Sequence, residues 1–335
     1  MTEREVAPPT KSVIITGARG YIGSALAARL RDAGYALRLV SRSADAANAA
    51  AGEALQAGYV QADLRDERAW SDLLSDSNTV VHLSSRTDLR AAEADPQGDE
   101  NINVEPVRAL IRAAARSGQQ PKVIFASTVT IVGNRHENPV DEKTLDQPCS
   151  VYDRHKLTCE ALLREATGNG VLRACSLRLA NVYGYGRVST NANRGILNSM
   201  LRRALNKEAL EVFGEGAYVR DFVHLQDVAE AFRAAVASEQ VYDGRHYVIA
   251  SGRGHTLAEA FDIIAEEALH ETGHRVEIRR APEPPDLHPI ERRNFVGDWR
   301  LFNELTGWRP RIELRAGIQD YFQRATSSPV FAADR

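Results

Sequence analysis

Cysteine is scarce in this sequence, with three residues in a chain of 335: Cys149, Cys159 and Cys175. The number is odd, no two of them form a Cys-x-x-Cys pair, and no histidine stands at zinc-ligand spacing from them. A disulfide scaffold is therefore excluded, and no metal site is expected. We expect reduced thiols and a cytoplasmic protein.

Long apolar runs are also absent, since none approaches the ~18 residues that a membrane-spanning helix requires. The first ten residues include two acids and two prolines, which is unlike a signal peptide. The formal net charge is only −3, so no broad basic surface predicts binding to nucleic acid. Hydrophobic residues at 43% and charged residues at 26% exclude a disordered chain.

What the sequence does contain is an alternation of short apolar runs with amphipathic segments. The predicted strands are 12–16, 36–40, 59–60, 79–83, 123–126 and 172–178, and the predicted helices between or after them are 21–33, 66–75, 104–117 and 152–167. Apolar strands that alternate with helices indicate a parallel sheet covered on both faces. We therefore predict an α/β fold of the Rossmann type, with a doubly wound sheet.

A glycine-rich turn joins the first predicted strand to the first predicted helix. The segment TGARGYIG, residues 16–23, allows a tight turn, close approach of a pyrophosphate and tight packing of the helix on the sheet. The helix N-terminus then supplies free N–H groups. A plain glycine-rich loop is the alternative, but the strand–turn–helix context favours dinucleotide binding. The expected contacts are Gly17, Arg19, Gly20, Tyr21, Ile22 and Gly23.

The end of the second predicted strand bears on which dinucleotide is bound. NAD-binding proteins usually carry an acid at this point, whereas this strand ends in Ser41, Arg42 and Ser43. Arg42 can bind a 2′-phosphate bidentately, and Arg19 adds a second cation. These residues favour NADP(H), unless Arg42 is only a solvated charge. Asp63, which precedes Leu64 after the third strand, is expected to accept from the adenine amino group.

The pattern changes after about residue 180, where the elements become shorter and the loops longer. Helices are predicted at 194–206, 226–238 and 256–269, and four prolines between 282 and 289 mark an extended loop. We predict an NADP-binding domain over 11–180, to which later segments return. Residues 181–325 are predicted to form mainly a smaller mixed α/β lobe for the substrate, with 1–10 and 326–335 as flexible tails.

Tyr152 and Lys156 form a Tyr-x-x-x-Lys pair on a predicted helix. Positions i and i+4 share one helix face, so the phenol and the ammonium reach the same space. A neighbouring ammonium lowers the pKa of a phenol, which lets tyrosine exchange a proton with a carbonyl or an alcohol. Upstream, Ser127 and Thr128 end a buried strand, and either hydroxyl could bond the substrate oxygen.

Taken in order, these motifs resemble the extended short-chain dehydrogenase/reductases, the NAD-dependent epimerase/dehydratase family. The resemblance covers residues 12–322, about the whole chain. The segments that carry it are TGARGYIG, Asp63-Leu64, His82-Leu83, Asn103, Ser-Thr128-x4-Gly133, Tyr152-x3-Lys156, Leu179-x-Asn181-Val-Tyr-Gly184 and Arg220-Asp-Phe-Val-His.

The resemblance implies roles for individual residues. It selects Thr128 as the catalytic hydroxyl, assigns Asn103 to the support of the active-site helix, and gives Lys156 a second contact with the nicotinamide ribose. Leu83, Ser84 and Ser85 match positions on the nicotinamide side. Nucleotide-sugar contacts are expected from Arg86, Thr128, Asn181, Arg194, Val212, Arg220 and Arg293, with Arg292 as the alternative to Arg293.

Departures from the family pattern narrow the expected chemistry. Val129 and Thr130 stand where a 4,6-dehydratase needs an Asp-Glu pair, and Ala126 and Ser127 stand where a fucose-synthase-like enzyme would have a cysteine. We therefore expect an NADPH-dependent reductase of the C4 ketone of a dTDP-4-keto-6-deoxysugar, similar to ketoreductases of antibiotic sugar pathways. An NAD-dependent nucleotide-sugar 4-epimerase is the alternative, and a non-catalytic NADP-binding regulatory protein is the second.

The helices at 101–117 and 152–167 carry apolar residues on more than one side, and in the family such helices form a four-helix contact between two subunits. We therefore expect a homodimer. The residues concerned are Val104, Val107, Leu110, Ile111, Leu157, Leu162 and Leu163.

Overall fold

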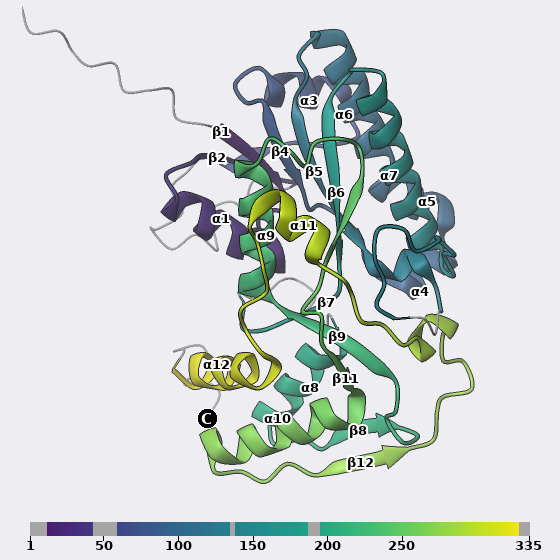
Figure 1. The fold of residues 1–335 in the computed structure, drawn as a ribbon, viewed down its shortest axis with the longest axis vertical. Coiled ribbons are helices and arrows are strands. Elements are labelled where there is room, and N and C mark those ends of the chain that lie inside the picture. The colour runs from purple at the N-terminus through teal and green to yellow at the C-terminus, as the bar shows by residue number, and fades with distance from the viewer. Residues whose placement is uncertain (1–11, 43–58, 135–137, 187–194, 328–335) are drawn as a thin grey trace, which may run out of the picture.

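The computed structural model describes residues 12–42, 59–134, 138–186 and 195–327. Its main feature is a parallel sheet in which the described strands follow the order β10-β6-β5-β4-β1-β2-β3 (Figure 1). These strands are β1 (Ser12–Thr16), β2 (Ala36–Ser41), β3 (Tyr59–Gln61), β4 (Thr79–His82), β5 (Lys122–Thr128), β6 (Arg173–Leu179) and β10 (His246–Ile249). The predicted Rossmann-type fold is confirmed.

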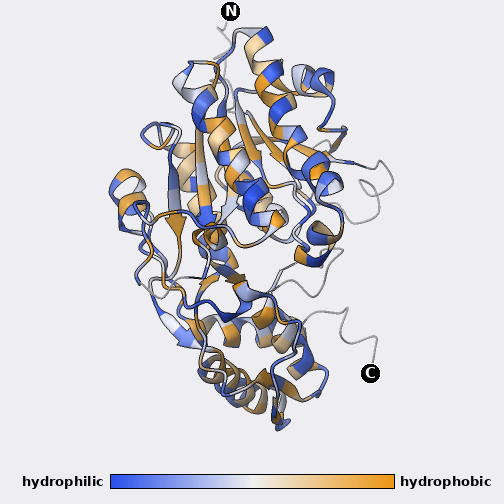
Figure 2. Cartoon of the chain, turned by 90° about the vertical axis from the view of Figure 1, so that its right-hand side faces the viewer, coloured by the Kyte–Doolittle hydropathy of each residue, from blue (hydrophilic) through white to orange (hydrophobic). Residues whose placement is uncertain are grey.

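Helices cover both faces of this sheet, as its apolar strands predict (Figures 1 and 2). Val13 and Ile15 of β1 pack in one core cluster with α1, α9 and α11, whereas Ile14 packs on the opposite face with α3, α6 and α7. The first set is α1 (Tyr21–Asp32), α9 (Leu225–Ala237) and α11 (Arg300–Thr306); the second is α3 (Glu67–Leu74), α6 (Glu105–Ser117) and α7 (Val151–Gly168).

Two short helices that periodicity did not reveal, α4 (Leu89–Ala94) and α5 (Pro96–Asn103), precede α6. Both begin with an aspartate whose side chain accepts from a backbone N–H of the first turn. They contain few large apolar residues, so a search for apolar periodicity passes over them. They matter for function because α5 packs against α7.

The rest of the chain builds a smaller lobe at one end of the sheet (Figure 1). Its core includes Tyr183, Leu201, Phe222, Phe261 and Phe322. The lobe contains the sheets β11-β9-β7 and β12-β8. Its elements are β7 (Asn181–Tyr183), α8 (Ile196–Leu205), β8 (Leu210–Phe213), β9 (Val219–His224), β11 (Gly254–Thr256), α10 (Leu257–Thr272), β12 (Ile278–Ala281) and α12 (Leu314–Ser327).

Two findings refine the predicted boundaries. The chain returns from the lobe to the large sheet through α9, β10 and α11, and β10 pairs with β6 at the sheet edge. Helix α12 ends at Ser327, two residues into the segment 326–335 that was predicted to be a flexible tail. No described helix is long and apolar enough to cross a membrane.

Candidate active site

The glycine turn lies where β1 meets β4. Gly17 has φ +65°, and a Cβ there would stand 2.9 Å from the Leu83 carbonyl carbon and the Ser84 nitrogen. A Cβ at Gly23 would stand 2.2 Å from the Gly17 oxygen. These two positions thus require glycine, one for its left-handed backbone and the other for close contact of helix and turn. Because glycine has no side chain, the backbone N–H groups at the N-terminus of α1 stay accessible, which is what binding of a pyrophosphate requires.

Two cavities, of which one is lined by this turn, together contain most of the predicted cofactor residues. A cavity of about 340 Å³ opens along the turn and reaches α7. A second, of about 800 Å³, lies beyond β2 and β3. The first is lined by Gly17, Gly20, Tyr21, Ile22, Gly23, Leu83, Ser85, Tyr152 and Lys156, and the second by Arg42, Asp63, Leu64, Ser84 and Ser85.

The remaining predicted cofactor residues are placed differently. Arg19 and Ser41 line neither cavity, and Ser43 lies outside the described residues. Asp63, the expected adenine contact, is held by the Arg65 guanidinium, which donates to both carboxylate oxygens at 2.6–3.2 Å. Hydrogen bonds from Arg65 lower the pKa of Asp63 to about 2. The 800 Å³ cavity therefore presents Arg42, Arg65 and Arg86 with one ionised acid among them.

Thr128, Tyr152 and Lys156 come together in the smaller cavity, from the end of β5 and the first turns of α7. Lys156 is buried, its Nζ donates to the Ala126 carbonyl at 2.8 Å, and it lies 4.6 Å from the centre of the Phe125 ring and 5.7 Å from that of Tyr152. The ammonium is thus anchored to β5 behind the phenol. This arrangement fits a tyrosine that exchanges a proton with a bound oxygen.

The two neighbouring hydroxyls at the end of β5 are not equivalent. Ser127 is buried and its hydroxyl donates to the Glu160 carboxylate, which also binds Arg178. Thr128 is partly exposed, and its oxygen accepts from the Thr130 N–H at the start of a short 3-10 turn. Both residues line the cavity, but the Ser127 hydroxyl is committed to Glu160, so the geometry favours Thr128 of the two candidates.

Asn103 lies at the end of α5 and holds the loop after β4. Its carboxamide oxygen accepts from Ser85 Oγ and the Arg86 N–H, and its Nδ2 donates to the Arg86 carbonyl and to Asp99. Its own backbone carbonyl accepts from Cys159 Sγ on α7. It therefore connects the loop after β4 to the helix that carries Tyr152, without itself lining either cavity.

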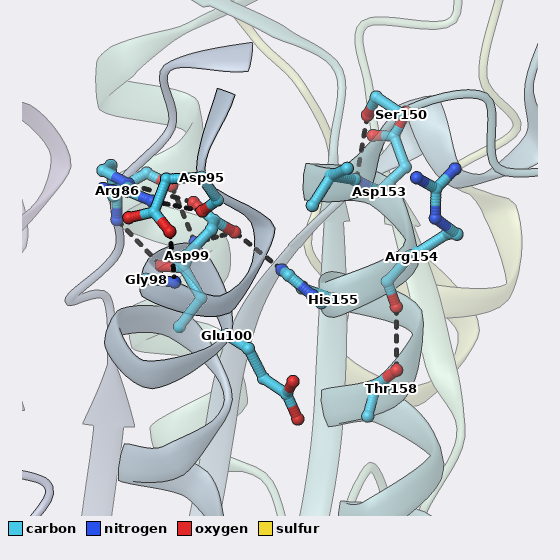
Figure 3. A network of polar contacts seen from close by, with 12 residues as sticks. Arg86, Asp95, Gly98, Asp99, Glu100, Ser150, Asp153, Arg154, His155 and Thr158 are labelled. Atoms are coloured by element: carbon cyan, nitrogen blue, oxygen red, sulfur yellow. Dashed lines mark hydrogen bonds and ion pairs between the residues drawn. The ribbon is translucent and has the colours of Figure 1, made fainter. Parts of the chain in front are cut away.

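Arg86, which was expected to contact the nucleotide sugar, forms an ion pair within the protein. Its Nε donates to the buried carboxylate of Asp99, whose other oxygen lies 2.7 Å from His155 Nδ1 (Figure 3). It lines the larger cavity and not the one that holds Tyr152. The cause is Asp99 on α5, a helix that the sequence pattern did not reveal, so no signal near Arg86 could have found this ion pair.

The 340 Å³ cavity is also lined by a buried arginine, Arg293, and by the acid Glu291. Asn181 lines it as well, and Arg293 Nη2 donates to Asn181 Oδ1 at 3.2 Å. Arg293 Nε is buried and has no hydrogen-bond partner in the part of the chain that the structure describes. Arg292, the alternative, points elsewhere and pairs with Glu283 at 3.1 Å.

Three further substrate expectations differ from the structure or fall outside it. Arg220 is 1% exposed and donates to the backbone carbonyls of Glu291 and Arg293, so it supports the Arg293 loop from beneath. Burial and the neighbouring Arg293 charge lower the pKa of Arg220 to about 9. Val212 of β8 packs into the core of the smaller lobe and lines neither cavity. Arg194 lies outside the described residues.

Sequence reasoning missed Asp153, the residue directly after Tyr152. It is fully buried and lines the 340 Å³ cavity. Its carboxylate accepts from the Ser150 and Thr130 hydroxyls. An acid beside the Tyr-x-x-x-Lys motif was the only available signal, and an acid at a helix start has a common structural explanation.

Comparisons with known proteins agree with this geometry. Residues 13–250 match the NAD dependent epimerase/dehydratase family. A UDP-glucose 4-epimerase of Corynebacterium glutamicum is 26% identical over 92% of this chain and 94% of its own length. A dTDP-L-rhamnose 4-epimerase of Burkholderia thailandensis is 27% identical, with 92% and 93% covered. A solved UDP-glucose 4-epimerase of Stenotrophomonas maltophila, with bound NAD and formylated UDP-arabinopyranose, has a TM-score of 0.81, 26% identity, and 95% and 99% coverage.

Proposed function

Because the chain belongs to the NAD dependent epimerase/dehydratase family, we propose that it is a nucleotide-sugar 4-epimerase. The observation that carries this proposal is that one cavity is lined by Thr128, Tyr152 and Lys156 and also by Asn181 and Arg293. Such a cavity can hold a sugar against the proton-transfer groups while its diphosphate meets a cation. Relatives that are named 4-epimerases favour inversion over net ketone reduction.

The residues of the chain supply the acid–base and positioning parts of the reaction. Tyr152 takes the proton of the sugar C4 hydroxyl and later returns it. Lys156 stays near the phenol ring and stabilises its ionised form, and Thr128 holds the sugar oxygen. Gly17, Gly20 and Gly23 of the turn would hold a nicotinamide cofactor, which would supply reversible hydride transfer at C4. We assign its binding mainly to the 11–180 domain and sugar binding to the 181–325 lobe.

Arg293 supports the nucleotide diphosphate part of the proposal. A buried guanidinium without a carboxylate partner is costly, and its Nε has no partner among the described residues. Burial lowers the pKa of Arg293, although the nearby carboxylates of Glu291 and Asp153 act in the opposite direction. A diphosphate would supply the missing acceptors and offset the charge of the guanidinium.

An NADPH-dependent 4-ketoreductase is the second candidate, and Arg42 favours it. Arg42 directly follows β2 and lines the 800 Å³ cavity, and β2 itself contains no acid. We expect Arg42→Ala to weaken NADPH binding by about 1.5–3 kcal/mol, the scale of a charged hydrogen bond, with NADH nearly unchanged. Titration of both cofactors measures this, and equal losses would contradict the assignment.

One pair of assays separates the two functions. The protein is incubated with UDP-glucose and no added cofactor or with catalytic NAD, and separately with a dTDP-4-keto-6-deoxysugar and NADPH. Product NMR then identifies the result. Formation of the C4 epimer without net cofactor consumption supports the epimerase, whereas stoichiometric NADPH oxidation with the ketosugar supports the reductase. If neither occurs while the cofactor binds, the regulatory alternative replaces both enzymes.

A further inference from the structure

Three side chains form a hydrogen-bonded line that leads away from the cavity. Thr128 Oγ1 lies 2.8 Å from Thr130 Oγ1, and Thr130 Oγ1 donates to Asp153 Oδ1. The second carboxylate oxygen accepts from Ser150 Oγ at 2.7 Å (Figure 3). Asp153 and Ser150 have no exposed surface, so water does not compete for these bonds.

The carboxylate fixes the direction of every bond in this line. An ionised carboxylate can only accept, so the single proton of the Thr130 hydroxyl is directed to Asp153. Thr130 can then only accept from its other neighbour, and the 2.8 Å contact requires Thr128 to donate. The Thr130 N–H also donates to Thr128 Oγ1, at 3.2 Å. Thr128 thus has its proton and one lone pair engaged within the protein, which leaves one lone pair for the cavity.

We propose that Asp153 is a positioning residue that makes Thr128 a hydrogen-bond acceptor toward the substrate, so that the site binds the sugar as a C4 alcohol in preference to a C4 ketone. The proposal deepens the proposed function and rests on it for the identity of the ligand. While the Tyr152 phenol is still protonated, a bound C4 hydroxyl can donate to the free lone pair of Thr128, and it turns its single proton to Tyr152 only for the transfer step. A ketone oxygen has no proton and would face that lone pair unpaired.

This preference distinguishes the two candidate reactions. An enzyme that starts from an alcohol gains from an acceptor at Thr128, whereas one that starts from a ketone needs a donor there. The hydrogen-bonded line from Thr128 through Thr130 to Asp153 therefore favours the epimerase, because its substrate and its product are both alcohols at C4. A ketone can receive the Thr128 proton only after the bond to Thr130 is broken, which leaves Thr130 with one partner fewer.

A neutron diffraction map of the deuterated protein tests the bond directions without any substrate. The deuteron of Thr128 is expected on the line to Thr130, and the deuteron of Thr130 on the line to Asp153. A deuteron on Thr130 that points to Thr128 would overturn the proposal. Because this measurement needs no nucleotide sugar, it decides the matter even if the proposed function fails.

The second measurement uses a matched ligand pair, dTDP-6-deoxyglucose and its 4-keto form, which differ only at C4. Calorimetric titration gives both dissociation constants for the wild type and for Thr130→Val, which keeps the shape of the side chain but loses the acceptor. Thr128 can then donate to the ligand. We expect the affinity for the ketone relative to the alcohol to rise roughly five- to tenfold, the value of one hydrogen bond.

Two variants serve as controls. Thr130→Ser restores the hydroxyl and should return the affinity ratio to within about twofold of the wild type. Ser150→Ala removes the other donor to Asp153 but leaves the line to Thr128, so its ratio should also stay within about twofold. A Thr130→Val ratio equal to that of the wild type would overturn the proposal. If neither ligand binds the wild type, the nucleotide-sugar function fails and the neutron map still decides the role of Asp153.

Discussion

Tyr152 is expected to matter for chemistry far more than for binding. Its ring packs at the start of α7 while its phenol faces the cavity with Thr128 and Lys156. Tyr152→Phe keeps the ring and removes the proton, so kcat should fall by about 10²–10⁴-fold. The dissociation constant for the nicotinamide cofactor should change less than about threefold, roughly 0.6 kcal/mol. Steady-state kinetics and cofactor titration measure both, and a variant that keeps most of its turnover would place the proton donor elsewhere.

Arg293 and Arg292 offer a matched comparison of two adjacent arginines. Arg293 lines the cavity with an unpartnered Nε, whereas Arg292 pairs with Glu283 and is partly exposed. Arg293→Ala should therefore raise KM for the nucleotide sugar by at least about tenfold and lower kcat less. Arg292→Ala should change KM less than about threefold. Equal effects of the two substitutions would remove Arg293 from the diphosphate site.

At the scale of elements, strand β9 carries two buried titratable groups with opposite pH behaviour. His224 accepts from the Gln226 N–H and so caps α9, and burial lowers its pKa to about 4. Asp221 accepts from Ser251, Gly252 and Gly297, and burial raises its pKa to about 6. Both side chains join the smaller lobe to segments that return to the large sheet.

The lowered pKa of His224 makes stability sensitive to acid. The unfolded chain binds a proton at this residue below pH 6.5 while the folded chain does not until about pH 4, so stability falls as the pH drops through that window. Asp221 acts in the opposite direction between about pH 4 and 6, because its folded form binds the proton more readily. His224→Asn keeps a capping side chain and removes the titration.

Denaturant unfolding at pH 7 and pH 4.5 measures this difference. Between the two values the free energy of unfolding should fall by roughly 2 kcal/mol less in His224→Asn than in the wild type. The exposed His274→Asn serves as the control and should follow the wild type. Parallel pH dependence of His224→Asn and the wild type would show that His224 does not carry this acid sensitivity.

At the scale of the whole molecule, the structure weakens the argument for a homodimer without removing the prediction. Of the apolar residues expected at the interface, Val104, Val107, Leu110 and Leu163 are buried within the chain. The outer side of α6 carries Arg112 in ion pairs with Glu67 and Glu105. Partly exposed apolar residues remain on both helices: Ile111, Leu157 and Leu162.

Light scattering measures the assembly directly. A homodimer gives about 74 kDa, twice the 36.9 kDa of one chain, at micromolar concentration. A mass near 37 kDa at low salt would end the prediction of a dimer.

The sequence by itself determined the features that depend on local spacing. Gly17 and Gly23 mark a turn that no other residue fits, the i, i+4 spacing brings Tyr152 and Lys156 to one helix face, and apolar runs identify the buried parallel strands. Each of these patterns involves residues that are only a few positions apart, so each can be recognised in the sequence without knowledge of the fold.

Only the tertiary structure decided how distant residues share partners. In the folded chain Arg293, and not Arg292, lines the cavity, and Arg220 supports the loop that carries Arg293. Arg86 forms an ion pair with Asp99 of α5. The fold also brings Thr130 of the turn after β5 to Asp153 of α7, 23 residues further on. The role of each of these side chains depends on which hydrogen-bond or ion-pair partner lies beside it. That partner comes from another helix, strand or loop, whose position is set by packing of the whole core.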